Sequence, residues 1–337
     1  IANTACPNFG YEYSVRRIKP EECEGLDLSH CVIAGNGGEP VLEQTLEAFS
    51  KKFGPYGFRP QTFMPCYGMA ESVLFVGGLK PMSQPPKVLT LSATDLETHI
   101  VRVLADNEPG GRKVVSCGKP GSGHQVITVD PDTLTPSNPN QVGELWVQGP
   151  SVPSGYWGLP EESAATFEGR LADTVEGSFL RTGDLGFLAE GEIYVTGRLK
   201  DLIIIAGRNH YPSDIELTVQ RSGAPVRMGA CVAISETVNG AEELVIIAEV
   251  DDRQFPAEAQ SENQGAKSLD EFWASAVKTV RGAVSKGHGL AVRSVVFLEP
   301  RSLEKTSSGK PRRRHYQKLF LRGDLAVLHE NRSPQTV

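Results

Sequence analysis

The first third of the chain alternates between short apolar runs and stretches with an apolar residue at every third or fourth position. The apolar runs at 31–34 and 63–66 predict strands, and the spacing over 41–53 predicts an amphipathic helix. A shorter helix is expected over 12–17, where Pro20 follows as a stop signal. Strands that alternate with helices indicate an open α/β sheet, whose ligands bind at the carboxyl ends of the strands.

Residues 77–149 show a different pattern, in which short apolar runs are separated by glycine and proline. The predicted strands are 88–91, 100–104, 125–130 and 143–149. This spacing predicts a small barrel or a distorted antiparallel sheet. A helix is expected to follow at 161–167.

A polar stretch then interrupts the apolar pattern. Arg181–Gly186 predicts a turn that holds out one carboxylate, Asp184. The apolar runs 192–195 and 202–205 predict a buried strand pair, joined by the polar sequence Gly197–Asp201. Because charged residues are rarely buried in a core, this joint indicates a cleft or a hinge between domains.

The last third of the chain predicts a compact α+β unit. A capping-box pattern at Ser213–Glu216 predicts the start of a helix. The other expected elements are strands at 229–234, 244–250 and 292–298, a helix at 269–288 and a mobile polar loop at 252–268.

The length of 337 residues is consistent with two domains. The expected boundaries are 1–199 and 200–337, and the first domain divides into an α/β part, 1–80, and a β-rich part, 81–199.

Composition narrows the class of protein. There are 34 Lys and Arg against 41 Asp and Glu, so the net charge is −7, which argues against a nucleic-acid partner. No run of about 18 apolar residues occurs, so no membrane span is expected. The 6 cysteines form no CxxC pair, which predicts free thiols in a reducing compartment and a cytoplasmic location. The chain begins with isoleucine and has no leader pattern, so we expect it to start within a larger protein.

Six short motifs, in order along most of the chain, carry a resemblance to a known superfamily. They are Gly37–Pro40, Tyr67–Glu71, Gly143–Pro150, Arg181–Gly186, Gly197–Asp201 and Lys305–Lys310. With this series the chain resembles the adenylate-forming (AMP-dependent synthetase and ligase) superfamily. Within it the chain is most similar to fatty acyl-AMP ligases. Asn36–Pro40 matches their Asn-Gly-x-Glu-Pro turn, and Ala70 stands where CoA ligases more often have threonine.

The resemblance also implies a fold and a distinguishing segment. It implies the later part of the large N-terminal domain, with an α/β sheet end and a small β-barrel-like subdomain, followed by a mobile α+β C-terminal domain. Residues 80–115 are expected to hold the extra segment of fatty acyl-AMP ligases, which is thought to obstruct the domain movement needed for CoA transfer. The family's phosphate loop lies upstream, so we expect a fragment whose activity in isolation is left open.

The implied reaction joins a fatty acid to ATP, giving an acyl-adenylate (acyl-AMP) and pyrophosphate. The acyl group would pass to an acyl-carrier protein or polyketide synthase in polyketide or lipid synthesis. Lys310 is implied to be the catalytic cation that bridges carboxylate and phosphate. Glu71 is implied to take part in catalysis by holding Mg²⁺, and Asp184 to accept hydrogen bonds from both ribose hydroxyls.

The other implied site residues surround the nucleotide. Those expected to bind ATP or AMP are Asn36, Gly37, Gly38, Glu39, Pro40, Tyr67, Gly68, Met69 and Ala70. Val195 is expected to touch the adenine, and Arg198 the ribose or a phosphate. Lys200 occupies the hinge position, where rotation would move Lys310 into and out of the site.

Several alternatives stay open. The glycine turn at 36–40 also suits an ordinary strand–helix connection, and Glu71 also suits the first turn of a helix. Val195 could equally pack in the core, and Lys310 could belong to a solvated basic tail. For the whole protein, the alternatives are a long-chain acyl-CoA synthetase and a non-catalytic adenylate-binding module.

Overall fold

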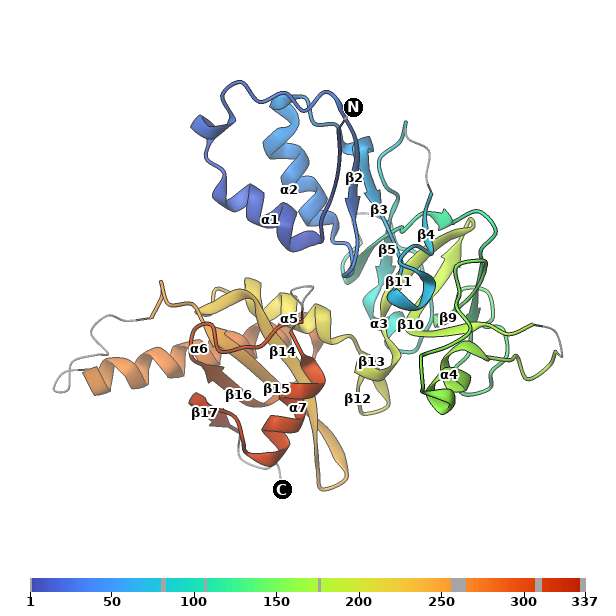
Figure 1. Cartoon of the computed structure of the whole chain (residues 1–337). Helices are drawn as coiled ribbons and strands as arrows, with labels where there is room; N and C mark the ends of the chain where they lie inside the picture. Colours follow the sequence, from blue (N-terminus) through green and yellow to red (C-terminus); the bar gives the residue numbers. More distant parts are fainter. Residues whose placement is uncertain are drawn as a thin grey trace. The chain divides into compact units, whose positions relative to one another are not determined.

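The chain folds into two compact units, Ile1–Lys200 and Asp201–Val337, and each is described by itself. The structure is a computed structural model that describes residues 2–79, 83–105, 108–174, 177–255, 265–306 and 311–333. Figure 1 shows its elements in chain order. The sequence pattern placed the domain boundary one residue earlier, between 199 and 200.

The first unit begins with a parallel sheet covered by two helices. Strands β1 (Ala2–Ala5), β2 (Cys31–Asn36) and β3 (Phe63–Pro65) lie in that order. Helices α1 (Asn8–Arg17) and α2 (Glu43–Phe53) pack on the sheet through the aromatic side chains of Tyr11, Phe49, Phe53, Phe58 and Phe63. Short 3₁₀ turns are η1 (Pro20–Cys23), η2 (Gly54–Tyr56) and η3 (Pro60–Thr62). Strands that alternate with helices thus form the expected α/β sheet.

The rest of the first unit is rich in antiparallel strands. Its main sheet has the order β11-β10-β9-β8, formed by β8 (Gln125–Val129), β9 (Gly143–Gln148), β10 (Leu180–Ala189) and β11 (Glu192–Arg198). Smaller pairs join β4 (Gly77–Leu79) to β7 (Lys119–Pro120) and β5 (Val88–Ser92) to β6 (Gly111–Val115). The helical segments are η4 (Ala70–Ser72), α3 (Ala93–Leu96) and α4 (Pro160–Phe167). Of the two expected architectures, the distorted antiparallel sheet describes these strands.

Two expectations for this unit are corrected. Residues 100–104 were expected to form a strand, but they make only isolated bridges, from Ile100 to Gln141 and from Val103 to Leu91. Asp184 does not lie in a free turn, because it belongs to β10, where the pairing with β9 is interrupted by a bulge.

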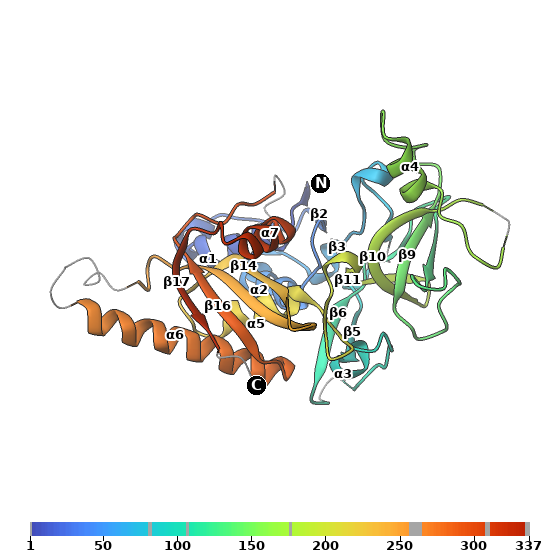
Figure 2. The ribbon, with the colours of Figure 1, turned by 90° about the horizontal axis from the view of Figure 1, so that it is seen from below.

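The second unit is a mixed sheet with helices on both faces. The sheet has the order β14-β15-β16-β17, and only β15 and β16 run parallel. Its strands are β14 (Val226–Val238), β15 (Ala241–Val250), β16 (Val292–Leu298) and β17 (Val327–Arg332). Helices α5 (Pro212–Arg221) and α6 (Gly265–His288) pack on one face and α7 (Arg313–Arg322) on the other, as Figure 2 shows. Alternate strand residues therefore face two separate apolar cores.

Aromatic rings mark the core under α6. Trp273 of α6 is buried and stacks on His329 of β17, with ring centroids 4.8 Å apart and an interplanar angle of 1°. Phe297 of β16 lies 5.1 Å from the Trp273 ring. Burial lowers the pKa of His329. The neutral imidazole thus contributes to the apolar packing of the second unit.

The second unit also corrects expectations. The predicted strand pair of 192–195 with 202–205 is wrong, because β11 pairs with β10, whereas β12 (Ile203–Ile205) pairs with β13 (Arg208–His210). The capping box is also wrong. Helix α5 begins at Pro212, and its N-cap residue Tyr211 makes no side-chain capping bond. Proline suits the first helical position because its missing N–H would have had no partner there.

Helix α6 begins at Gly265, inside the segment 252–268 that was expected to be a loop; residues 256–264 lie outside the described part. The sequence pattern did not predict α7 or β17. Among the described residues, none of the helices combines the length and apolarity needed to cross a membrane.

Candidate active site

Two chain segments leave the parallel sheet side by side at the carboxyl ends of β2 and β3. They are Asn36–Pro40 and Tyr67–Glu71, and the N–H of Cys66 donates a 2.8 Å hydrogen bond to the carbonyl of Asn36. Gly37 approaches so closely that an added Cβ would lie 2.8 Å from the Cys66 carbonyl oxygen. Only glycine fits there without movement, which explains this position in the turn.

The buried side chain of Asn8, at the start of α1, holds the 36–40 turn in place. Its Oδ1 accepts hydrogen bonds from Asn36 Nδ2 at 3.0 Å and from the N–H of Leu42 at 3.3 Å. Its Nδ2 donates to the carbonyl of Pro40 at 2.5 Å. The Oδ1 of Asn36 is buried and has no partner among the described residues. The sequence carried no signal for the role of Asn8.

Two predicted site residues, Tyr67 and Arg198, converge on the carboxylate of a third, Asp184. The hydroxyl of Tyr67 donates to Asp184 Oδ2 at 2.9 Å, and Arg198 Nε donates to Asp184 Oδ1 at 2.9 Å. Tyr67 and Asp184 are buried, whereas the Arg198 side chain is 62% exposed. Burial, reinforced by the Asp184 charge, raises the pKa of Tyr67 well above its usual value. Tyr67 is therefore a neutral donor to the Asp184 carboxylate, and each oxygen of a carboxylate can accept more than one hydrogen bond.

A β-bulge next to Asp184 is organised by a buried carboxylate that the sequence analysis missed. Gly183 has a φ of 68°, and its N–H donates to Glu144 Oε1 at 3.0 Å. Arg181 Nη2 donates to Glu144 Oε2 at 2.8 Å. The N–H of Asp184 donates to the hydroxyl of Thr182 at 3.0 Å. The available signal was a lone acid in the otherwise apolar strand 143–148.

Glu71 lies in the 3₁₀ turn η4, a few residues after Tyr67. The hydroxyl of Tyr156 donates to its Oε1 at 2.8 Å. No group of three or more metal-ligating side chains occurs in the part of the chain that the structure describes. Mg²⁺ commonly takes one or two protein carboxylates and completes its shell with water and substrate phosphates. A single carboxylate such as Glu71 therefore fits a magnesium ion that arrives with a nucleotide.

The loop around Glu71 is tightly folded. An added Cβ at Gly68 would lie 1.6 Å from the Leu74 carbonyl oxygen. Val73 and Leu74 adopt φ values of 51° and 87°, which are outliers for side chains of this size, and both are exposed. The N–H of Leu74 donates to the Met69 carbonyl at 2.9 Å. These features fix the backbone that carries the Glu71 carboxylate.

The remaining predicted residues come from several parts of the chain. Val195 and Met69 are partly buried and pack against the core of the first unit, which suits the alternative of core packing for Val195. Lys200 lies in the 3₁₀ turn η5 (Leu199–Asp201), at the junction of the two units. Lys310 lies outside the described residues.

Described parts of the expected extra segment, 80–115, are fastened to the β10–β11 hairpin. Lys87 Nζ lies 2.7 Å from Glu190 Oε2 and 3.2 Å from Glu192 Oε1. Arg112 Nη2 donates to the carbonyl of Thr196 at 2.8 Å. Residues 80–82 and 106–107 lie outside the described part. The segment thus reaches the strand that leads to Lys200.

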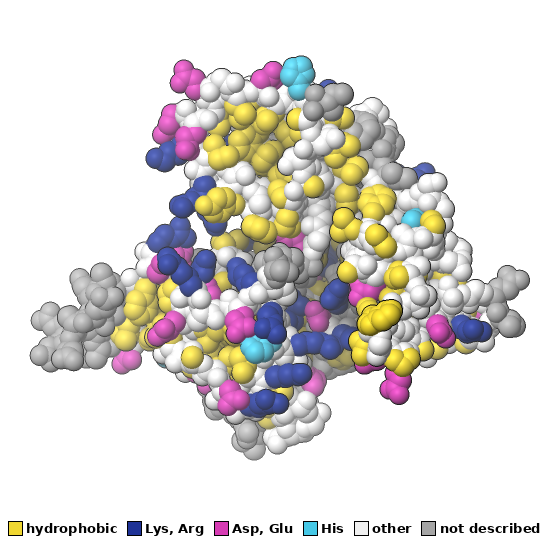
Figure 3. All heavy atoms as spheres, in the orientation of Figure 1, with side chains coloured by type: hydrophobic (Ala, Val, Ile, Leu, Met, Phe, Trp, Pro, Cys, Tyr) yellow, Lys and Arg dark blue, Asp and Glu magenta, His cyan; other side chains and the backbone are white. Residues whose placement is uncertain are grey.

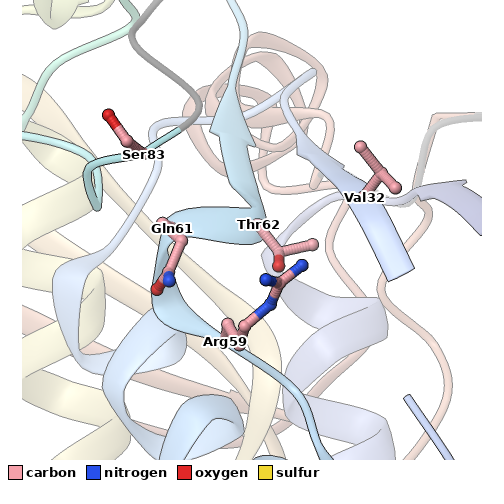
Figure 4. A pocket seen from close by; sticks show the side chains of 5 residues that line it. All are labelled: Val32, Arg59, Gln61, Thr62 and Ser83. Atoms are coloured by element: carbon pink, nitrogen blue, oxygen red, sulfur yellow. The ribbon is translucent and has the colours of Figure 1, made fainter. Parts of the chain in front are cut away.

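A cavity of about 310 Å³ lies elsewhere in the first unit, around η3 and the start of β2. Figure 4 shows its lining side chains, Val32, Arg59, Gln61, Thr62 and Ser83. Val32 and Thr62 stand near the beginnings of β2 and β3, whereas Asn36 is the last residue of β2 and Tyr67 follows the end of β3. This cavity is therefore distinct from the candidate site.

Comparisons with known proteins show which proteins the chain resembles. Residues 11–157 match the family described as AMP-binding enzyme, and residues 200–330 match the Disco-interacting protein 2-like AMP domain. The chain is 43% identical, over 96% of its length, to the medium-chain-fatty-acid–[acyl-carrier-protein] ligase JamA of Moorena producens, and it covers 53% of that protein. It is 38% identical, over 97% of its length, to the putative fatty-acid–CoA ligase fadD25 of Mycobacterium tuberculosis, covering 54% of it.

A solved structure from work on fatty acyl-adenylate ligases of E. coli and L. pneumophila superposes with a TM-score of 0.78. It is 30% identical to the chain, and the match covers 95% of the chain and 54% of that structure. The fold and the matches over both units define an enzyme domain of the adenylate-forming class. Within this class, the chain is similar over both of its units to fatty-acid ligases and fatty acyl-adenylate ligases. It spans about half the length of the curated relatives that it matches.

Proposed function

We propose that the protein to which this chain belongs activates a fatty acid with ATP, forming an acyl-adenylate and releasing pyrophosphate. The observation that carries the proposal is the Asp184 carboxylate, held by Tyr67 and Arg198 in the unit where the 36–40 turn leaves the sheet. A buried, oriented carboxylate next to closely packed backbone suits a ribose better than it suits a structural turn.

In this proposal the residues of the first unit bind and orient the nucleotide. Asp184 accepts hydrogen bonds from both ribose hydroxyls, and the 36–40 turn and Tyr67 line the adenine. Arg198 lies beside the ribose or a phosphate. Glu71 holds Mg²⁺, which would neutralise phosphate charge when bound. Holding two anions in reacting geometry supplies most of the catalysis in such a transfer.

Lys310 is the proposed catalytic cation. An ammonium on a flexible side chain can bridge the fatty carboxylate and the α-phosphate, which lowers their repulsion during attack. In the full-length enzyme, Lys310→Ala should abolish pyrophosphate release while ATP binding stays nearly unchanged. Lys318→Ala, which removes an exposed lysine from α7, is the matched control. Normal pyrophosphate release by Lys310→Ala would refute the role.

An acyl-carrier protein, alone or within a polyketide synthase, is the proposed acceptor of the acyl group. This choice is supported by the similarity to JamA and by the fastening of residues 83–115 to β11 through Arg112. The similarity to fadD25 favours the alternative acceptor, CoA. We propose a cytoplasmic location because ATP is supplied there, and the cysteines are free thiols.

The acceptor is tested by offering the complete enzyme CoA and a phosphopantetheinylated carrier protein separately, after acyl-adenylate has formed. Transfer to the carrier protein with little acyl-CoA would support the proposal. Appreciable acyl-CoA would favour the synthetase alternative. Failure to form any acyl-adenylate would favour a non-catalytic adenylate-binding module.

A further inference from the structure

The described residues on either side of Lys310 form a closed stem in the second unit. Lys305 and Pro311 form an antiparallel bridge. Arg312 Nη1 lies 2.7 Å from Glu304 Oε2. The hydroxyl of Tyr316, from α7, accepts a 2.6 Å hydrogen bond from the N–H of Glu304. The stem, defined as residues 302–305 and 311–313, is therefore joined to the sheet side of α7.

Arg313 ends the stem and begins α7, and its guanidinium makes three short polar contacts. Its Nε and Nη2 donate to the two carboxylate oxygens of Glu216 at 2.9 Å each, and its Nη1 donates to Asp201 Oδ2 at 2.6 Å. Burial alone would lower the pKa of Arg313, but these two carboxylates raise it, so the side chain stays charged. The planar guanidinium suits this forked arrangement in a way that lysine cannot copy.

The two carboxylates come from different parts of the same unit. Glu216 belongs to α5, and its Oε1 also accepts a 3.0 Å hydrogen bond from the N–H of Ala233 in β14. Asp201 is the residue directly after Lys200 and the first residue of the second unit. The side chains of all three residues are mostly shielded from water, with exposures of 21% for Arg313, 19% for Asp201 and 9% for Glu216.

Basic side chains gather over this region of the second unit, as Figure 3 shows around α7. Arg313 differs from its neighbours Arg312 and Arg314 because it is turned inward, whereas the Arg312 and Arg314 side chains are 48% and 59% exposed. An ordinary basic surface would not bury one arginine between two carboxylates taken from α5 and the hinge, since burying charges is costly unless they are paired.

We propose that Arg313 is a positioning residue that couples the hinge to the catalytic loop. It fastens the stem, three residues after Lys310, to Asp201, one residue after Lys200. The described stem and the residue that follows Lys200 are then held in one fixed arrangement, so the stem follows a rotation at the hinge. This inference rests on the proposed catalytic role of Lys310.

The test uses the full-length enzyme and two mild variants. Asp201→Asn weakens the contact of Arg313 with the hinge side and a longer, 3.9 Å contact with Arg314, whereas the Glu216–Arg313 pair remains. Arg313→Lys keeps the charge and loses the fork. Both should lower kcat for pyrophosphate release about 10- to 100-fold, since small misplacements of a reacting group have such effects. The KM for ATP and the melting temperature should change little.

Asp251→Asn is the matched control, because Asp251 and Arg253 form a pair in the same unit with the same 2.6 Å separation. It should leave kcat unchanged. Lys310→Ala is measured in parallel to separate the two proposals. If Lys310→Ala is inactive while Asp201→Asn and Arg313→Lys keep wild-type kcat, the coupling role is overturned and the catalytic role stands. If Lys310→Ala is active, the proposed function itself has failed.

Discussion

Each of the two carboxylate oxygens of Asp184 accepts a hydrogen bond from the protein, Oδ2 from the Tyr67 hydroxyl and Oδ1 from Arg198 Nε. Tyr67 and Arg198 fix the orientation of the carboxylate before any ligand arrives. A preorganised acceptor loses little conformational entropy when it binds two adjacent hydroxyls. At the scale of single residues, the candidate site is therefore defined by a pair of donors that hold one acceptor in place.

Removing this acceptor should weaken nucleotide binding. We expect Asp184→Ala in the full-length protein to lower the affinity for an acyl-adenylate analogue by about 10- to 100-fold, the effect of losing hydrogen bonds to a charged group. The affinity of Asp184→Asn should lie between those of Asp184→Ala and the wild type. Isothermal titration calorimetry measures the affinities, with the exposed Asp173 as the site of a control substitution, Asp173→Ala. Equal affinities in Asp184→Ala and wild type would rule out the ribose contact.

Tyr67 should make stability sensitive to alkaline pH. Its pKa in the folded protein is raised above the unfolded value of about 10, so its contribution is complete below pH 10 and is lost as pH rises toward the folded pKa. As pH rises above 10, the free energy of unfolding should fall less steeply for Tyr67→Phe than for wild type. The two slopes should differ by up to about 1.4 kcal/mol per pH unit. Urea titrations at several pH values measure this slope. Parallel slopes in wild type and Tyr67→Phe, with exposed Tyr13→Phe as control, would contradict the assignment.

At the scale of elements, the hydrophobic pattern predicted those strands and helices that have one continuous apolar face. The strands β2 and β14 to β16 and the helix α2 follow this rule. Residues 100–104 do not form the strand that their apolar pattern predicted, because their two bridges go to different neighbours. Helix α7 was missed because its first residues are charged. Arg313 is largely shielded from water only because Asp201 and Glu216, which are distant in sequence, pair with it in the folded unit.

In the candidate site, too, residues with a local sequence signal could be predicted, and residues that depend on distant partners could not. Glycine turns and single carboxylates at strand ends have local signals, so 36–40, Tyr67–Glu71 and Asp184 could be listed from the sequence. The clamp by Asn8 and the buried Glu144 behind the bulge depend on partners 28 and 39 positions away. Local patterns carry no information on such distant pairs, and the roles of the site residues themselves stay predictions.

The loop from Gly68 to Leu74 offers a test of an element. Gly68→Ala should displace this loop, because the new Cβ would lie 1.6 Å from the Leu74 carbonyl oxygen. We expect a loss of about 1–3 kcal/mol in the free energy of unfolding, the range for overpacking of a well-packed site. Gly54→Ala is the control, since nothing lies within 4 Å of its added Cβ and its φ is −55°. Equal unfolding midpoints in urea for both variants would contradict the close approach.

At the scale of the whole molecule, each unit has its own apolar cores, and the chain passes between them at η5. The first unit contains the residues expected to bind the nucleotide, and the second contains the stem of the Lys310 loop. An enzyme built in this way can use one position of the second unit for adenylation and another for transfer.

The hinge is tested at Lys200. Proline fixes φ near −65° and removes the backbone N–H, so Lys200→Pro should hold one arrangement of the units. Turnover with carrier protein should fall by at least about tenfold. Differential scanning calorimetry should show both units still folded. Lys200→Ala, which keeps backbone freedom, should turn over at nearly the wild-type rate. Unchanged turnover of Lys200→Pro would exclude a hinge at this position.

The 3 tryptophans are divided between the units, since Trp146 and Trp157 precede Lys200 and Trp273 follows it. In a variant with phenylalanine at the other two positions, the intrinsic fluorescence would come from Trp273 alone. It would report the unfolding of the second unit without a dye. His329, whose imidazole stacks on Trp273, should quench this fluorescence when the imidazole is protonated at acid pH. One fluorimeter cuvette could thus record whether the two halves of this chain unfold together or in turn.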